Sequence, residues 1–117
     1  RMQMIIISAI LEFANEVDRD KVIDLTTETQ LATRLEEPGC ISYCFAPDPA
    51  VFNRIQVYEL WEDEKSLADH FKHKYYNDMK NFIHSVGVTN TENQMYLIDK
   101  HEPVYSAEGN TRETFFN

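Results

Sequence analysis

Residues 36–62 read EEPGCISYCFAPDPAVFNRIQVYELWE, and this stretch decides the fold. The Pro-Gly pair at 38–39 stops a helix and turns the chain, because proline restricts the residue before it and glycine tolerates positive φ. The runs 40–46 and 54–62 are rich in β-branched and aromatic residues, which is typical of strands. A proline-rich connection at 47–50 joins them, so the stretch predicts an antiparallel hairpin.

Two helices are expected, one on either side of this hairpin. The first follows an N-cap at Asp18 or Asp20 and ends at the Pro-Gly turn. The second begins at the N-cap Asp63, and its apolar residues continue to about Ser85 with a break near Tyr75. Helical spacing in the first helix predicts a core-facing stripe made of Val22, Leu25, Thr29 and Ala32.

Two further strands complete the pattern. Residues 2–13 are almost continuously apolar, as in a central strand that is buried on both faces. After a loop at 86–93, residues 94–101 alternate as a last strand. The order strand, helix, strand, strand, helix, strand predicts an α+β ferredoxin-like fold with an antiparallel sheet. We expect this domain to span residues 1–102, followed by a polar C-terminal tail at 103–117 that needs a partner surface to become ordered.

The third strand carries large apolar side chains on both of its faces. Alternation places one set on one face and the other set on the opposite face: Ile55, Val57, Glu59 and Trp61 against Gln56, Tyr58, Leu60 and Glu62. Helices of this fold cover only one face of the sheet. We therefore expect a second copy to cover the other face, which gives a homodimer that packs through the sheet.

Charge and composition limit the partners. The formal charge is −9, from 11 basic and 20 acidic residues, which argues against nucleic-acid and membrane binding and favours small molecules or a second copy. Apolar runs fall short of the roughly 18 residues that a membrane span needs, and no signal region opens the chain.

Cys40 and Cys44 lie too far apart on one strand to form a disulfide, so we expect both to be reduced thiols. A cytoplasmic protein is expected.

Four short motifs lie in the part of the chain that runs from the first strand to the end of the second helix. They are Glu37-Pro38-Gly39-Cys40 with Tyr43 after it, Asp48-Pro49, Glu59-x-Trp61 and Ala68-x-His70. Together they resemble the antibiotic biosynthesis monooxygenase family. The resemblance implies a dimeric α/β barrel with a cavity in each subunit between sheet and helices. It also implies oxygenation of quinols, anthrones or related polyphenols by O₂, which some members carry out with no flavin, haem or metal cofactor.

Two residues are the candidates for catalysis. A deprotonated electron-rich phenol can itself give an electron to O₂, so the site must chiefly accept a proton and exclude water. His70 is the candidate base, because imidazole titrates near neutrality. The alternative is a histidine at the helix border that bonds Glu59 for structural reasons. Glu59, a carboxylate on an inward face, is expected to orient His70, to act as a base itself, or to hold a backbone group.

Other side chains are expected to line the cavity. Trp61 could stack on a flat substrate or bond a quinone oxygen, unless it is simply a core aromatic. Val57 stands where some family members, by the resemblance, have a substrate-binding asparagine. The remaining candidates for the wall are Ser8, Ser42, Tyr43 and Phe71. His70 and His73 are neighbours on a helix but lack a third ligand, so no metal site is expected.

These observations lead to one main functional hypothesis. The chain is expected to be a cofactor-independent monooxygenase that acts on a small aromatic or quinol-type substrate with O₂, after a pocket histidine has removed a proton. The alternatives are a non-catalytic dimer that binds a small hydrophobic molecule, and a haem-degrading or isomerase activity, since relatives on the same scaffold have these activities.

Overall fold

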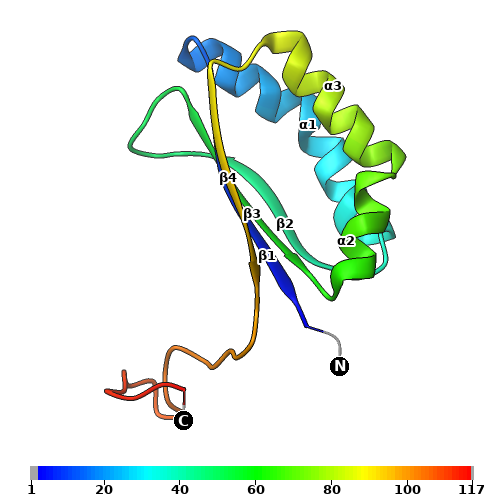
Figure 1. Ribbon diagram of the computed structural model, residues 1–117. Helices are drawn as coiled ribbons and strands as arrows, with labels where there is room; N and C mark the ends of the chain where they lie inside the picture. The colour runs from blue at the N-terminus through cyan, green and yellow to red at the C-terminus, as the bar shows by residue number, and fades with distance from the viewer. Residues whose placement is uncertain (1–2, 117) are drawn as a thin grey trace.

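The computed structural model describes residues 3–116 and shows three helices on one face of a four-stranded sheet (Figure 1). The strand order is β2-β3-β1-β4, and every neighbouring pair is antiparallel. This is the ferredoxin-like α+β fold predicted from the sequence. In chain order the elements are β1 Ile5–Glu12, α1 Glu16–Glu36, β2 Cys40–Pro47, β3 Arg54–Trp61, α2 Glu64–Phe71, α3 Lys74–Val86 and β4 Asn90–Leu97.

β1 is a central strand, as predicted, and pairs with β3 and β4. Met2, where the strand was expected to begin, lies outside the described residues. The last strand was predicted at 94–101 after a loop at 86–93. This prediction was wrong by four residues, since the observed strand β4 begins at Asn90 and ends at Leu97. Its first residues are polar and show no apolar alternation, yet backbone pairing with β1 suffices for an edge strand.

The boundary and the buried face of α1 both differ from the prediction. Asn15, not Asp18 or Asp20, is the N-cap, and its side chain accepts a hydrogen bond from the Asp18 N–H at 2.8 Å. Leu25 was expected in the core but is 37% exposed. The buried positions of α1 are Arg19, Val22, Thr26, Gln30 and Thr33.

Two of the buried polar side chains of α1, those of Thr26 and Gln30, are satisfied by the backbone, whereas the buried Thr33 hydroxyl has no hydrogen-bond partner within residues 3–116. The Thr26 hydroxyl donates to the Val22 carbonyl at 2.8 Å. The Gln30 side chain both accepts from the Phe45 N–H, at 2.8 Å, and donates to the Phe45 carbonyl, at 3.2 Å. The two Gln30 bonds fasten α1 to β2, and all three bonds offset the cost of burying polar side chains.

The second predicted helix is divided into α2 and α3. Asp63 is the N-cap of α2, as predicted, and accepts a hydrogen bond from the Ser66 N–H at 2.8 Å. The break lies at Lys72 and His73 rather than at Tyr75, because His73 is the N-cap of α3 and its Nδ1 accepts from the Tyr75 N–H at 3.1 Å. None of the helices in residues 3–116 is long and apolar enough to cross a membrane.

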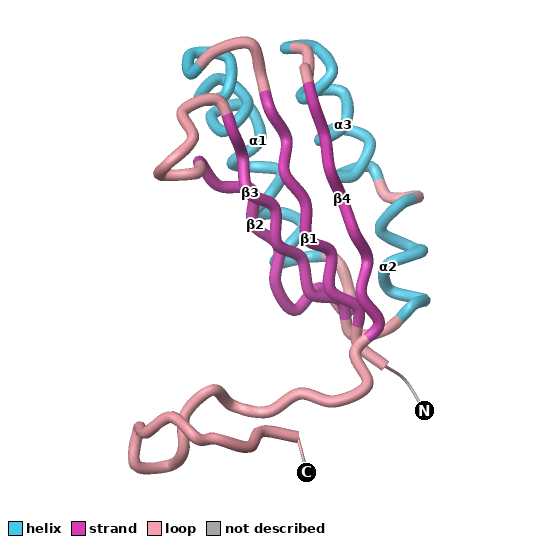
Figure 2. The backbone as a smooth tube through the Cα atoms, turned by 60° about the vertical axis from the view of Figure 1, so that its left-hand side comes forward, coloured by secondary structure: helices cyan, strands magenta, loops and turns pink. Residues whose placement is uncertain are grey.

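Two apolar clusters lie between the sheet and the helices. One is built around Ile5, Tyr43, Trp61, Leu67 and Met79, and the other around Phe13, Val22, Ile55 and Val57. The opposite face of the sheet carries no helix (Figure 1). Residues 98–116 leave the end of β4 and run away from the domain as an arm on that helix-free side (Figures 1 and 2).

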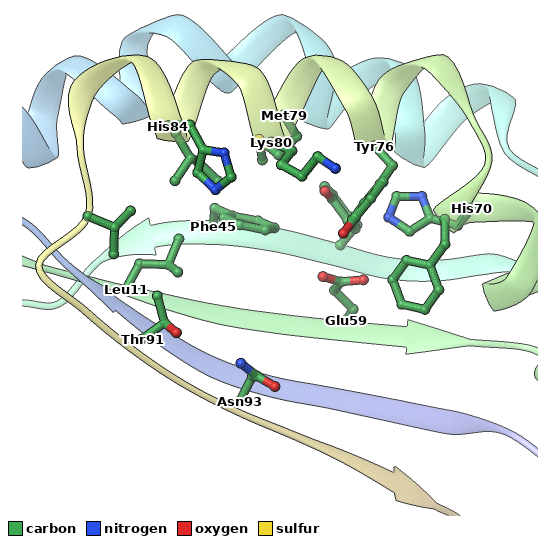
Figure 3. Close-up of a pocket in the computed structure, with 14 residues that line it drawn as sticks. Leu11, Phe45, Glu59, His70, Tyr76, Met79, Lys80, His84, Thr91 and Asn93 are labelled. Atoms are coloured by element: carbon green, nitrogen blue, oxygen red, sulfur yellow. The ribbon is translucent and has the colours of Figure 1, made fainter.

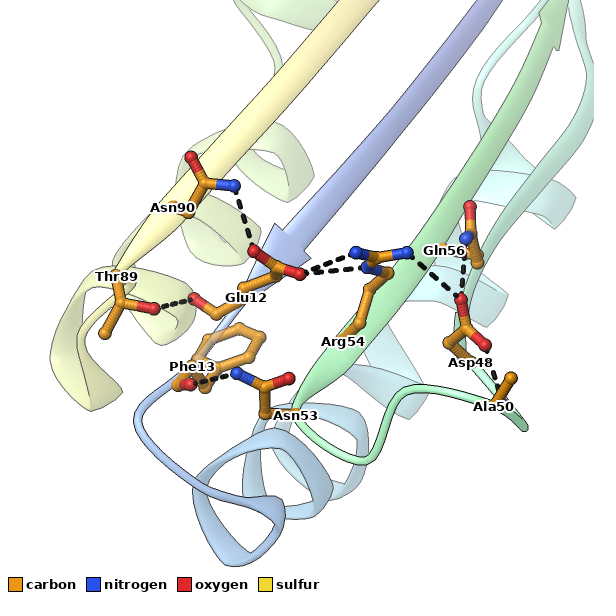
Figure 4. A network of polar contacts seen from close by, with 9 residues as sticks. All are labelled: Glu12, Phe13, Asp48, Ala50, Asn53, Arg54, Gln56, Thr89 and Asn90. Carbon is orange, nitrogen blue, oxygen red and sulfur yellow. Dashed lines mark hydrogen bonds and ion pairs between the residues drawn. The ribbon is translucent and has the colours of Figure 1, made fainter.

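A polar network ties the strands together at one end of the sheet (Figure 4). Arg54 donates two hydrogen bonds to Glu12, at 2.8 and 3.0 Å, and lies 3.8 Å from Asp48. The Asn90 amide donates to Glu12 at 2.9 Å, and the Gln56 amide donates to Asp48 at 2.8 Å. The network joins β1, β3 and β4 to the 48–53 connection and so holds the strands together at this end of the sheet.

Candidate functional site

A cavity of about 330 Å³ lies between the sheet and the helices α2 and α3 (Figure 3). Most of its wall is aromatic or aliphatic: Leu11, Tyr43, Phe45, Phe71, Tyr76, Met79, Ile83 and Val88. The polar side chains in its wall are Glu59, His70, Lys80, His84, Thr91 and Asn93. A mostly apolar pocket with a few convergent polar groups is the usual form of a site for a small organic ligand.

His70 is nearly fully buried, and Glu37 fixes its ring. The Nδ1 atom of His70 lies 2.9 and 3.1 Å from the two carboxylate oxygens of Glu37. Because a carboxylate only accepts, Nδ1 carries the hydrogen, and neutral His70 keeps its lone pair on Nε2. Among residues 3–116, no group is hydrogen-bonded to Nε2. Burial lowers the pKa of His70 and the Glu37 contact partly opposes this, so the ring is neutral at pH 7 and ready to accept a proton.

The turn after α1 brings Glu37 to His70. Glu37 is the C-cap of α1, and its N–H donates to the Thr33 carbonyl at 3.2 Å. Gly39 follows with a φ of +82°, and a Cβ there would lie only 2.0 Å from the Ser66 hydroxyl. Ser66 precedes His70 by one helical turn on α2. Glycine at position 39 therefore allows α2 to approach close enough for His70 to meet Glu37.

Glu59 does not orient His70, so that prediction was wrong. The Glu59 side chain instead accepts a hydrogen bond from the Trp61 indole N–H at 2.9 Å. Burial, assisted by the charge of Glu37, raises the pKa of Glu59 to about 7 although the Trp61 bond opposes the shift. Glu59 lines the cavity (Figure 3) and is a second group there that can hold or release a proton near neutral pH.

Trp61 lies behind the cavity wall. The side chain is fully buried, and its ring centroid is 4.5 Å from that of His70 with the planes tilted by 34°. With no exposed surface and with its N–H bonded to Glu59, it does not contact the cavity, in contrast to the stacking role expected from the sequence. It supports the His70 ring from behind.

Tyr43 and Phe71 do line the cavity. Tyr43 meets His70 edge-on, with centroids 5.5 Å apart and planes at 69°. Burial raises the pKa of Tyr43 far above its ordinary value, so its hydroxyl stays protonated and can donate. Phe71 is 42% exposed and adjoins His70 along α2. These two side chains lie where the sequence placed them.

Val57 and Ser8 do not line the cavity. Val57 belongs to the apolar cluster beneath α1. In β1 the side chains of Ile7, Ala9 and Leu11 pack toward the helices, so alternation turns Ser8 to the helix-free face, where it is exposed. The sequence alone left the strand register open, and a shift of one residue exchanges the two faces.

Several lining residues were missed. Tyr76, Lys80 and His84 recur every four residues on α3, a spacing that places them on one helix face and that could have indicated them. Thr91 and Asn93 lie on the part of β4 that was expected to be a loop, so no signal was available for them. Glu37 was noted only as part of the turn and of a family motif, with no role at the site. Within residues 3–116, no three His, Cys, Asp or Glu side chains are grouped to hold a metal ion.

Comparison with known proteins gives a family and a fold. The family model described as antibiotic biosynthesis monooxygenase matches residues 4–81. An uncharacterized protein of Synechocystis sp. is 30% identical over 61 residues, which are 52% of this chain. That alignment spans only 42% of the relative's own length.

Solved structures share the whole architecture. A candidate antibiotic biosynthesis monooxygenase of Deinococcus radiodurans superposes with a TM-score of 0.76 at 18% identity, covering 87% of this chain and 99% of that one. A similarly named protein of Caulobacter crescentus gives 0.71 at 17% identity, with 86% and 92% covered. A Bacteroides thetaiotaomicron protein described as a possible oxidoreductase gives 0.72 at 21% identity, with 84% and 100% covered. At these identities the likeness shows the fold.

Proposed function

The chain belongs to the antibiotic biosynthesis monooxygenase family, and from this premise we propose that it is a cofactor-independent monooxygenase for a small aromatic substrate of the hydroquinone type. The observation that carries the proposal is the state of His70. Its Nδ1 is held by Glu37, its Nε2 is free of hydrogen bonds within residues 3–116, and it borders a largely apolar cavity. A neutral imidazole in this position is suited to accept a proton from a bound phenol.

The reaction balances without an external reductant. A hydroquinone with a ring C–H reacts with O₂ to give a hydroxyquinone and water, so one oxygen atom enters the product and the other leaves as water. The substrate supplies all four electrons that O₂ gains. Deprotonation of a phenol hydroxyl makes the ring electron-rich enough to pass one electron to O₂, and the radical pair then combines at carbon to form a peroxide. Loss of water from this peroxide gives the quinone.

Three residues of the cavity are assigned to these steps. His70 Nε2 takes the proton from the substrate hydroxyl. Glu59, with its pKa of about 7, is partly protonated at neutral pH and supplies a proton to the departing water. The Tyr43 hydroxyl donates a hydrogen bond to a substrate oxygen. The surrounding aromatic and aliphatic side chains exclude water and so protect the radical pair.

The functional unit in this proposal is a homodimer that packs through the helix-free face of the sheet. Ile6, Ile10, Tyr58 and Leu60 give this face an apolar surface. The arm leaves the domain on the same side and exposes Val104, Tyr105, Phe115 and Phe116. Exposed apolar side chains that gather on one face are typical of an interface between subunits. Cys40 and Cys44 are both free, which supports a reducing compartment such as the cytoplasm.

Oxygen uptake by the EDTA-treated protein tests the proposal. The substrates are 1,4-dihydroxynaphthalene and anthrone, each corrected for uptake without protein. We expect protein-dependent uptake that His70→Ala reduces by about 10²-fold or more, the usual contribution of a general base. His101→Ala, an exposed histidine outside the cavity, is the control and should retain activity. No uptake with either substrate, or full activity in His70→Ala, would contradict the proposal.

A further inference from the structure

The charge at the cavity differs from that of the chain as a whole. The chain has 20 acidic and 11 basic residues. In the described part of the cavity wall, however, Glu59 is the single carboxylate, and burial raises its pKa to about 7. The wall also contains the cation Lys80 and the imidazoles of His70 and His84. The cavity wall of this acidic protein thus contains one carboxylate, and a second, that of Glu37, lies behind His70.

Lys80 has no carboxylate partner, unlike two other lysines of α2 and α3. Lys65 pairs with Asp69 at 2.7 Å, and Lys74 pairs with Asp78 at 2.5 Å. Within residues 3–116, Lys80 has no ion pair, and its ammonium lies 5.7 Å from the Tyr76 ring centroid. Its neighbours one turn away on α3 are Tyr76, Asn77, Ile83 and His84, none of which is acidic. The ammonium is therefore available to a ligand.

The polar groups of the cavity lie in different places according to their chemistry. Lys80 and His84 are one turn apart on α3, and both extend toward the cavity from the helix side (Figure 3). Glu59 rises from the sheet, and His70 lies at the α2 end beside Tyr76. A ring held between Phe45 and Tyr76 would have proton-accepting groups at one end and the ammonium along its α3 edge. Across the cavity, the Asn93 amide and the Thr91 hydroxyl add neutral polar groups.

We propose that the substrate is an aromatic acid, that is, a hydroxylated ring bearing an ionised carboxylate, and that Lys80 is its counter-ion. This inference rests on the proposed function and names its substrate class. In a chain with a net charge of −9, an anionic ligand is repelled at long range, so a local cation is needed to bind it. Lys80 is the residue that provides this cation in the described cavity wall.

Binding can be measured separately from the reaction. The two probes are 6-hydroxy-2-naphthoate and 2-naphthol, which differ by the carboxylate, and their affinities are obtained by titration calorimetry. The quantity compared is the affinity for 6-hydroxy-2-naphthoate divided by the affinity for 2-naphthol. We expect this ratio to fall about fivefold in Lys80→Gln, which is the effect of losing a partly exposed ion pair. Lys80→Arg should keep the ratio. Added salt should lower the ratio in the wild type.

The matched control is Lys21→Gln, which makes the same change in net charge on an exposed position of α1 away from the cavity. An unchanged ratio in Lys80→Gln, or an equal fall in Lys21→Gln, would overturn the assignment of Lys80. Oxygen uptake with 1,4-dihydroxynaphthalene keeps the two proposals apart. If oxygen is taken up but the affinity ratio does not depend on Lys80, only the aromatic-acid substrate class is rejected. If the affinity ratio depends on Lys80 but no hydroquinone causes oxygen uptake, the oxygenase is rejected and the anion site is retained.

Discussion

A single ring nitrogen connects the turn after α1 to the chemistry of the cavity. Glu37 holds Nδ1 of His70 from one side, and Trp61 packs against the ring from another. The carboxylate decides which nitrogen carries the hydrogen and therefore which one can accept a proton. Glu37 lies behind His70 and acts through it, so it is a positioning residue.

Replacing Glu37 by glutamine should change the pH dependence of the reaction. The amide oxygen can still accept from Nδ1, but the negative charge that raises the pKa of His70 is lost. His70 must be neutral to act as a base, so we expect the acid limb of kcat/KM to move to lower pH. We also expect kcat to fall by less than in His70→Ala. Stopped-flow or electrode rates between pH 5 and 9 would measure this. If the acid limb of the kcat/KM profile lies at the same pH in Glu37→Gln and in the wild type, Glu37 has only a structural role.

Replacing Glu59 by glutamine should change how stability depends on pH. The folded-state pKa of Glu59, about 7, is above the ordinary value of 4.5, so its stabilising contribution is present at low pH and is lost as pH rises through 7. Relative to Glu59→Gln, the wild type should lose about 3 kcal/mol between pH 4.5 and pH 7.5. Urea unfolding at these pH values measures the difference. The exposed Glu62→Gln is the control, and equal pH dependence in all three proteins would contradict the raised pKa.

Residue types identified part of the site from the sequence alone. His70, Glu59 and Tyr43 were found because an imidazole, an inward carboxylate and a phenol are unusual on core-facing positions. Glu37 was not found, because its partner is 33 residues away and only the folded turn brings them together. Trp61 was placed on the correct face of β3, but whether a large aromatic side chain reaches the cavity depends on packing that the sequence pattern does not specify.

Among the secondary elements, the approach of α2 to the Pro-Gly turn determines the site. Gly39 has a φ of +82° and leaves no room for a Cβ next to Ser66. Gly109 has the same φ of +82°, but nothing lies within 4 Å of the position of its Cβ. An alanine at either position would therefore have a strained φ, but only the Cβ of an alanine at position 39 would collide with a neighbouring side chain.

Gly39→Ala should be more damaging than Gly109→Ala. We expect the strained φ to cost about 1 kcal/mol in either variant, and the collision with Ser66 to add about 1–3 kcal/mol at position 39. Displacement of α2 should also separate His70 from Glu37 and lower kcat in Gly39→Ala alone. Chemical denaturation and oxygen uptake measure the two effects. Equal loss of stability in both variants would show that the contact with Ser66 does not restrain α2.

The elements were predictable where apolar periodicity is strong and missed where polar groups take its place. β1, the hairpin and the N-cap Asp63 follow directly from apolar runs, turn residues and capping preferences. The buried face of α1 was mispredicted because the polar residues Thr26, Gln30 and Thr33 are buried, and apolar spacing does not indicate such positions. β4 was shifted because its pairing with β1 uses backbone groups, and these leave no trace in side-chain hydrophobicity.

At the scale of the whole molecule, no helix of residues 3–116 covers one face of the sheet, and the arm at 98–116 runs away from the domain on that side. The sheet pattern predicted the uncovered face, because β3 is apolar on both sides. The arm was predicted as a polar tail that needs a partner surface, and it exposes four large apolar side chains. A second copy that covers this face would explain both features.

Replacing the aromatic residues of the arm should weaken the dimer. Phe115→Ser with Phe116→Ser removes two exposed side chains that we expect to pack on the second copy, so the dissociation constant should rise by about tenfold or more. Sedimentation velocity over a range of concentrations measures the change. Glu113→Gln, an exposed neighbour, is the control. A wild-type protein that is monomeric throughout, or a dimer unaffected by the double substitution, would contradict this account.

The central claim is that the cavity oxygenates an aromatic ring with O₂ and without an external reductant, with His70 as the base. Turnover of 1,4-dihydroxynaphthalene under ¹⁸O₂, followed by mass spectrometry, tests it most directly. We predict one ¹⁸O atom in the new C–O bond of the hydroxyquinone, the second in water, and loss of labelled product in His70→Ala. Product oxygen derived from solvent, or label recovered in hydrogen peroxide, would contradict the account.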